Sequence, residues 1–154
     1  MKILPKDIQF LANDLIKSLE QELTKTLKTT GEILKSEIKR EVINLIDQSP
    51  YTPKVYVRTH KLEKSITKSK VDLGVNGVSI DVYSDDDVAR SHHMYDKKQP
   101  LEAYGEIVET GTGYDYGFPF SGVPRRFVGN VIDRESDSIM NLISKAVGDA
   151  IRKL

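Results

Sequence analysis

Aliphatic residues recur at steps of three and four along the first third of the chain, and this period constrains the fold more than any other feature. They stand at Leu4, Ile8, Leu11, Leu15, Leu19, Leu23 and Leu27 and then, in the same phase, at Leu34, Ile38, Val42, Leu45 and Ile46. Such spacing places apolar side chains on one face of an α-helix. We therefore predict one long helix over residues 6–48, with Gly31 as the place for a kink. A two-helix hairpin broken at Gly31 is the alternative, although one glycine costs only about 1 kcal/mol inside a helix.

The predicted helix is long for the chain that must cover it. At 1.5 Å per residue it would reach roughly 60 Å. The whole chain has 154 residues, enough for a single domain over 1–154. We expect part of the apolar stripe to contact another chain, because so small a domain cannot cover all of it.

The composition excludes several classes of function. There are no cysteines, which removes disulfides, thiolate metal sites and thiol chemistry. Lys and Arg number 23 and Asp and Glu number 23, and this zero net charge argues against a dedicated nucleic-acid-binding protein. No apolar run approaches the roughly 18 residues that a membrane-spanning helix needs.

Alternating residues in the middle of the chain predict a β-hairpin in the region 66–83. Val71–Val75 and Val78–Val82 flank Asn76-Gly77, a tight-turn signal, and alternate so as to bury one face. A second amphipathic pattern predicts a carboxy-terminal helix over 124–153. The fold class is therefore α+β, with both helices packed on a small antiparallel sheet.

A polar loop over 84–101 contains the residues that most resemble a metal site. Asp85-Asp86-Asp87 and His92-His93 offer carboxylates and imidazoles. Adjacent side chains in an extended segment point to opposite sides, and the spacing matches no known metal-binding loop. We predict no metal and no cofactor.

A bend rich in glycine and aromatic residues follows over 102–123. Gly111-Thr112-Gly113 could cradle an anion, but it lacks the strand, helix and lysine of a phosphate loop, which favours a tight bend. Glu109 could act as a general acid or base, but no second catalytic group lies at a recognisable spacing. A salt bridge, or a hydrogen bond to the bend, is the better interpretation of Glu109, and we predict no enzyme.

Arg125-Arg126 could bind phosphate, an acidic partner surface or Glu109. The aromatic residues between Tyr114 and Phe120 could stack on bases, pack at a subunit interface or join the core. A nucleic-acid-binding protein that uses these groups is the alternative function.

Several short motifs in a fixed order resemble a phage family. They are Tyr51, Pro53, Tyr56, Arg58-Thr59, Leu62 and Ser65-Ile66, then Glu109-Thr110-Gly111-Thr112-Gly113, then Arg126-Phe127. Together they look like the tail-completion or head–tail joining proteins of long-tailed phages and prophages, often described as minor tail components. Thr110 stands where an aromatic residue is usual, Arg126 replaces a proline, and His60 replaces a glycine.

The resemblance implies a structural protein of the virion, assembled in the host cytoplasm. Such proteins form a homo-oligomeric ring, most often a hexamer, between the head connector protein and the tail-tube protein, and DNA passes through the lumen without specific binding. It implies no enzymatic activity and no membrane partner. The candidate interface residues are Tyr104, Glu109, Gly111, Thr112, Gly113, Arg125, Arg126 and Phe127.

Overall fold

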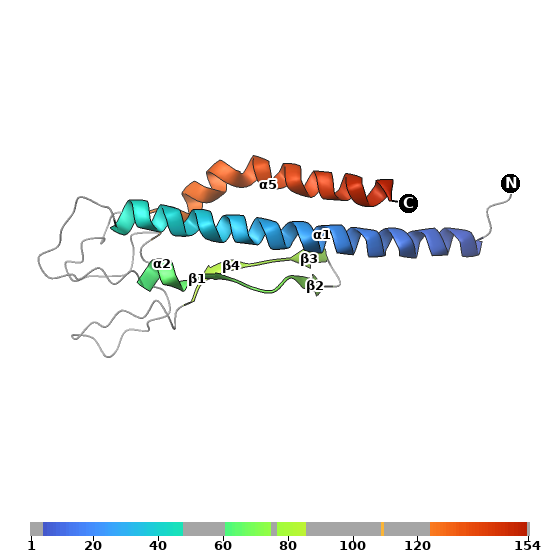
Figure 1. Ribbon diagram of the computed structural model, residues 1–154, viewed down its shortest axis with the longest axis horizontal. Helices are drawn as coiled ribbons and strands as arrows, with labels where there is room; N and C mark the ends of the chain where they lie inside the picture. The colour runs from blue at the N-terminus through green and yellow to red at the C-terminus, as the bar shows by residue number, and fades with distance from the viewer. Residues whose placement is uncertain (1–4, 48–60, 75–76, 86–108, 110–123, 154) are drawn as a thin grey trace, which may run out of the picture. The chain divides into compact units, whose positions relative to one another are not determined.

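The computed structural model describes residues 5–47, 61–74, 77–85, 109 and 124–153. Its longest element is α1, Pro5–Val42, followed directly by a π-helical turn, η1, at Ile43–Asp47 (Figure 1). Pro5 suits the first turn, where a backbone N–H has no helical partner. The helix runs unbroken through Gly31, so the chain forms one long helix and the two-helix hairpin is wrong.

Four short strands follow the short helix α2, Lys61–Ser65. They are β1, Ile66–Lys68; β2, Asp72–Gly74; β3, Gly77–Ser79; and β4, Val82–Ser84. β1 pairs antiparallel with β4, and β2 pairs antiparallel with β3, which gives two two-stranded sheets. The second long helix is α5, Phe127–Arg152. These elements confirm the α+β class.

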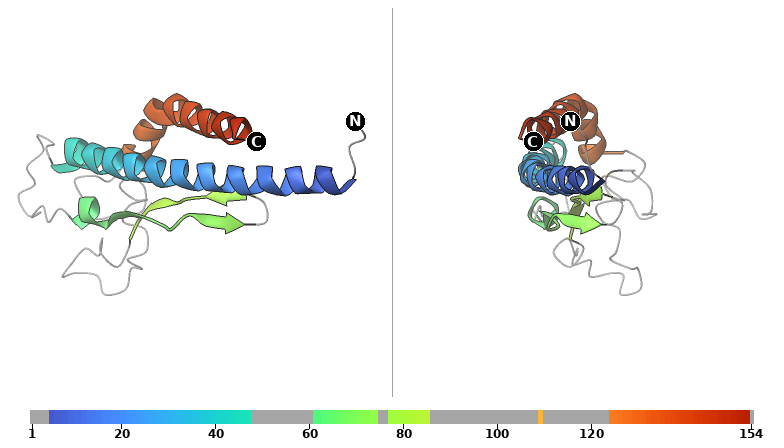
Figure 2. Two further views of the ribbon diagram at one scale, coloured as in Figure 1. Left: turned by 45° about the vertical axis from the view of Figure 1, so that its right-hand side comes forward. Right: turned by 90° about the vertical axis from the view of Figure 1, so that its right-hand side faces the viewer.

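The register of β2 and β3 differs from the prediction, in which Asn76-Gly77 formed the turn, because Gly77 belongs to β3. Leu73 pairs with Val78 and Gly74 with Gly77. Figure 2 shows the two strands side by side. Gly77 has a φ of 141°, a conformation that favours glycine because residues with a Cβ rarely adopt it. The strands are shorter than predicted, and β3 begins one residue earlier.

The chain forms two compact units, each built from separated segments. Unit 1 comprises Met1–Glu32, Ser69–Asp81 and Glu135–Leu154, and unit 2 comprises Ile33–Lys68 and Val82–Arg134. Neither unit is continuous in sequence. Each therefore depends on contacts between residues far apart in the chain.

Unit 2 contains the main apolar core. Its members come from α1, α2, β1 and the start of α5, so one cluster joins all four elements. They are Ile38, Val42, Leu62, Ile66, Phe127 and Val131, each at most 5% exposed. Burying side chains of this size stabilises the fold by roughly 1.5–3 kcal/mol each.

Unit 1 brings the first part of α1 beside the last part of α5. Ala146 and Ala150 are 4% and 0% exposed, and such small side chains allow close approach of a neighbouring helix. Ser18 Oγ donates to the carbonyl oxygen of Ala150 at 3.2 Å. Lys153 and Glu22 form an ion pair at the same end.

The hairpin β2–β3 in unit 1 corrects one prediction. All three residues of β2 are exposed, and Leu73 is 57% exposed, so this strand has no buried face. Val78 and Ile80 are only half-buried. No helix in the described part of the chain combines the length and apolar character that a membrane span requires.

Candidate functional site

The amino terminus of α5 is the place where the predicted site residues that the structure describes meet. The first four N–H groups of any α-helix have no partner within the helix. Here Glu109 supplies two acceptors: Oε2 accepts the N–H of Val128 at 2.9 Å, and Oε1 accepts that of Gly129 at 2.8 Å. A carboxylate is also favoured at this end by the helix dipole. Both oxygens of Glu109 are therefore engaged in capping α5.

The N–H groups on either side of this pair bond to carbonyl oxygens of Arg125 and Arg126. Phe127 N donates to the carbonyl oxygen of Arg125 at 2.6 Å, and Asn130 N donates to that of Arg126 at 2.8 Å. The N–H groups of Phe127, Val128 and Gly129 are thus satisfied, and that of Asn130 makes the first i→i−4 bond of α5. The arrangement is a capped helix start, and it stabilises the fold.

Arg125 caps the carboxy-terminal end of another helical element. Its side chain is half-buried, and Nη1 donates to the carbonyl oxygen of Leu45 at 2.8 Å. Leu45 belongs to η1, where carbonyl groups of the last turn lack helical partners. Arg125 therefore joins the start of α5 to the end of α1 within unit 2.

Arg126 lies at the surface beside Asp133. Its Nη2 is 3.3 Å from Asp133 Oδ2, and the two side chains are 59% and 65% exposed. The guanidinium group also lies against Gly129, where an added Cβ would be 2.8 Å from Arg126 Nη2. An exposed pair of this kind contributes only about 0–1 kcal/mol, so stability does not explain its placement.

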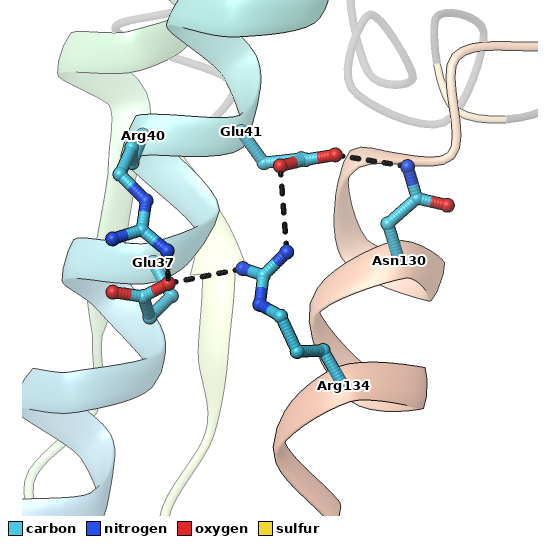
Figure 3. Close-up of polar contacts among 5 residues, drawn as sticks. All are labelled: Glu37, Arg40, Glu41, Asn130 and Arg134. Atoms are coloured by element: carbon cyan, nitrogen blue, oxygen red, sulfur yellow. Dashed lines mark hydrogen bonds and ion pairs between the residues drawn. The ribbon is translucent and has the colours of Figure 1, made fainter.

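A polar network joins α1 to α5 one to two turns after the start of α5 (Figure 3). Arg134 lies between two carboxylates of α1, with Nη2 3.0 Å from Glu37 Oε2 and Nη1 3.7 Å from Glu41 Oε2. Asn130 Nδ2 donates to Glu41 Oε1 at 2.9 Å, and Arg40 pairs with Glu37. Glu41 therefore lies beside Asn130 and Glu37 beside Arg134, which sets the helices antiparallel here.

Sequence reasoning did not identify this network. A usable signal existed, because Glu37 and Glu41 are four residues apart on α1, and Asn130 and Arg134 are four apart on α5. Residues at that spacing share one helix face. Which helix faces which is a tertiary property, so the spacing alone could not pair them.

The residues of the resemblance that the structure describes, Leu62, Ser65-Ile66, Glu109 and Arg126-Phe127, lie in unit 2. Leu62, Ile66 and Phe127 belong to one core cluster. Ser65 is fully buried; its Oγ donates to the carbonyl oxygen of Leu62 at 2.7 Å and lies 2.8 Å from Ser84 Oγ. Residues of two motifs, 61 and 65 positions apart in sequence, thus build one framework.

Phe127 requires a correction. We expected it at a subunit interface, but its side chain is 2% exposed and packs in the core of unit 2. Glu109, Arg125 and Arg126 surround the start of the same helix. The remaining candidates, Tyr104, Gly111, Thr112 and Gly113, lie outside the described residues.

The described residues contain no group of three His, Asp or Glu side chains that could hold a metal ion. Most of the Asp and His residues of the predicted polar loop, from Asp86 to His93, lie outside the described residues. Asp85 is described, and its N–H donates to the carbonyl oxygen of Ser65 at 2.8 Å. That contact extends the pairing of β4 beside α2.

Comparison with known proteins identifies a family. The model of a protein family described as YomN matches residues 12–152, nearly the whole chain. The match includes α1 from residue 12 onward, the strands and α5. No curated protein and no solved structure matches.

Proposed function

Because this chain belongs to the YomN family, which is phage- or prophage-derived, we propose that it is a structural protein of the phage head–tail junction. In this proposal copies of the chain form a closed ring, most simply a hexamer, between the head connector and the tail tube. DNA passes through the lumen without specific binding. The protein acts by assembly and carries out no reaction.

The observation that carries the proposal is the convergence of the signature residues. Leu62 and Ile66 pack with Phe127, Ser65 donates to the carbonyl oxygen of Leu62, and Glu109 caps the helix that Phe127 begins. A chance match would not by itself place a polar residue such as Glu109 against the helix that Phe127 begins. Their meeting supports the resemblance to tail-completion proteins, and through it the function.

The contacts of the two arginines weigh against the alternative of nucleic-acid binding. Arg125 donates to the carbonyl oxygen of Leu45, and Arg126 pairs with Asp133. A guanidinium group that already bonds to another group of the same chain is less available to a phosphate. DNA retention that falls steeply with added salt would nevertheless favour that alternative.

Complementation of a phage or prophage that lacks this gene tests the function. We expect the deletion to yield filled heads and free tails that do not join, and the wild-type gene to restore infectious particles. Normal particles from the deletion would overturn the proposed function.

Arg126→Glu tests whether the exposed guanidinium contacts a neighbour. Arg152→Glu is the matched control, because Arg152 is 77% exposed and also pairs with an aspartate, Asp149, at 3.5 Å. We expect Arg126→Glu to block joining and Arg152→Glu to leave it intact, with both variants melting like the wild type. Normal joining by a folded Arg126→Glu protein would remove Arg126 from the interface.

A further inference from the structure

Unit 1 leaves apolar side chains uncovered on both of its helices. On α1, Ile8, Leu11 and Ile16 are 59%, 53% and 54% exposed. On α5, Met140 and Ile151 are 60% and 55% exposed. Clusters of exposed apolar side chains on a soluble protein mark interaction surfaces.

The α1 cluster is uncovered because α5 ends too early to reach it. Near its end, α5 contacts α1 through Ala150 with Ser18 and through Lys153 with Glu22. The part of α1 before Ser18 extends about 20 Å beyond that contact, at 1.5 Å per residue. Every residue from 8 to 14 is exposed. The apolar stripe that α5 partly covers thus continues past its end.

Two apolar stripes of equal spacing contain four of these exposed side chains, Ile8, Leu11, Met140 and Ile151, while their other members are half-buried. Both place four aliphatic or thioether side chains at successive steps of three, four and four residues: Ile8, Leu11, Leu15 and Leu19 on α1, and Met140, Ile143, Val147 and Ile151 on α5. Equal spacing gives each helix a row of side chains over about three turns, so the rows can interdigitate along their whole length. On α5 this row is distinct from the buried Ala146 and Ala150.

We propose that these stripes bind each other between successive copies: the α1 end of one copy packs on the exposed α5 stripe of the next. This inference rests on the proposed homo-oligomeric function. An α1–α1 contact would close a pair of copies and leave the α5 stripe uncovered. A contact between two different surfaces covers both stripes and repeats around a ring.

The size of the contact fits a ring better than an isolated pair. The four stripe side chains that are more than half exposed offer roughly 400 Å² of apolar area, at about 100 Å² each. Stable complexes of two proteins bury about 1,600 Å² in total. A single junction is therefore weak. The junction that closes the ring forms between copies that are already joined, so it costs no further translational entropy. Association is expected only at high protein concentration.

Sedimentation of the full chain at concentrations up to the millimolar range tests the contact. Ile8→Glu and Met140→Glu each place a charge in one stripe and should abolish association. Leu73→Glu is the matched control, since Leu73 is 57% exposed in the same unit but belongs to neither stripe. An equimolar mixture of Ile8→Glu and Met140→Glu retains one intact junction and should form dimers but nothing larger.

Disulfide trapping gives an independent readout, because the chain has no cysteine of its own. A mixture of Ile8→Cys with Met140→Cys or with Ile151→Cys should cross-link, and the better pair reveals the direction of packing. Cross-linking mainly between two Ile8→Cys copies, or no more than Leu73→Cys gives, would overturn the proposal. A wild-type chain that stays monomeric at every concentration would also overturn it.

Complementation separates this contact from the function itself. If the gene deletion blocks joining while Ile8→Glu and Met140→Glu give normal particles, the contact is wrong and the junction role stands. If the deletion has no effect while the stripes still cross-link, the contact stands and the junction role is wrong.

Discussion

Glu109 supplies α5 with a cap that its own first residues cannot provide. The residue just before the helix is Arg126, which has no short oxygen-bearing side chain to accept an N–H of the first turn. The acceptors come instead from a residue 19 positions away from Val128. A polar residue distant in sequence thus fixes where this helix starts.

Replacing Glu109 with Ala should lower the free energy of unfolding by about 1 kcal/mol, since loss of a helix cap typically costs 0.5–2 kcal/mol. Glu109→Gln keeps only one acceptor oxygen and should lose less. Glu20→Ala, at an exposed position of α1, serves as control. Chemical denaturation measures all three, and equal stability of Glu109→Ala and the control would show that the cap contributes nothing.

Phe127→Ala should destabilise the chain by about 3–5 kcal/mol, because it empties a site in the core that is 2% exposed. The same substitution at an interface would leave the free chain as stable as before. Thermal melting of the purified variant distinguishes the two. An unchanged melting temperature would show that the Phe127 side chain lies at the surface.

Among the elements, α1 was predicted most accurately from the sequence and the strands were predicted least accurately. Apolar residues at steps of three and four over about forty residues predict an α-helix. The free-energy cost of Gly31 inside the helix is too small to end it. The period could not say which part of the stripe is covered, so Ile8 and Leu11 are exposed although they continue the buried row. Alternation predicted the hairpin, but two-stranded ladders of three residues leave faces such as that of Leu73 uncovered.

The ion pair between α1 and α5 in unit 1 should make stability depend on pH. The hydrogen bond from Lys153 lowers the pKa of Glu22 below its ordinary value of 4.5. An acid whose pKa is lower in the folded state contributes stability above its unfolded pKa and loses it as the pH falls through the folded pKa. Glu22→Gln should therefore be less stable than wild type at neutral pH, and the difference should vanish in acid.

Unfolding curves at neutral pH and near pH 2 measure this difference, with Glu20→Gln as the control for an exposed carboxylate. Added salt should shrink the neutral-pH difference, since the pair is at the surface. A difference that persists in acid would assign the effect to packing.

At the scale of the whole molecule, each unit depends on segments from opposite parts of the chain. Unit 1 combines the first 32 residues with the last 20, and the hydrogen bond from Ser18 to Ala150 spans 132 positions. Sequence patterns identified both helices, because each period is local. They could not show the pairing of Glu37 with Arg134 or the cap from Glu109, which depend on where distant segments meet.

Deletion of residues 135–154 should therefore remove more helix than the deleted residues contain. Without Ala146 and Ala150 beside it, the first part of α1 loses its neighbour, and isolated helices are marginal in water. Circular dichroism of the truncated chain measures the loss. A decrease that matches the deleted helical residues alone would show that α1 is stable by itself.

The same arrangement sets the order in which parts of the protein can fold during translation. The first part of α1 leaves the ribosome long before Ala146 and Ala150 have been translated, and at 5–20 residues per second the delay is roughly 6–24 s. Over that interval its leucine row has no partner within the chain. The nascent protein must be shielded by other molecules or stay unstructured, and its assembly surfaces become complete only when translation has nearly finished.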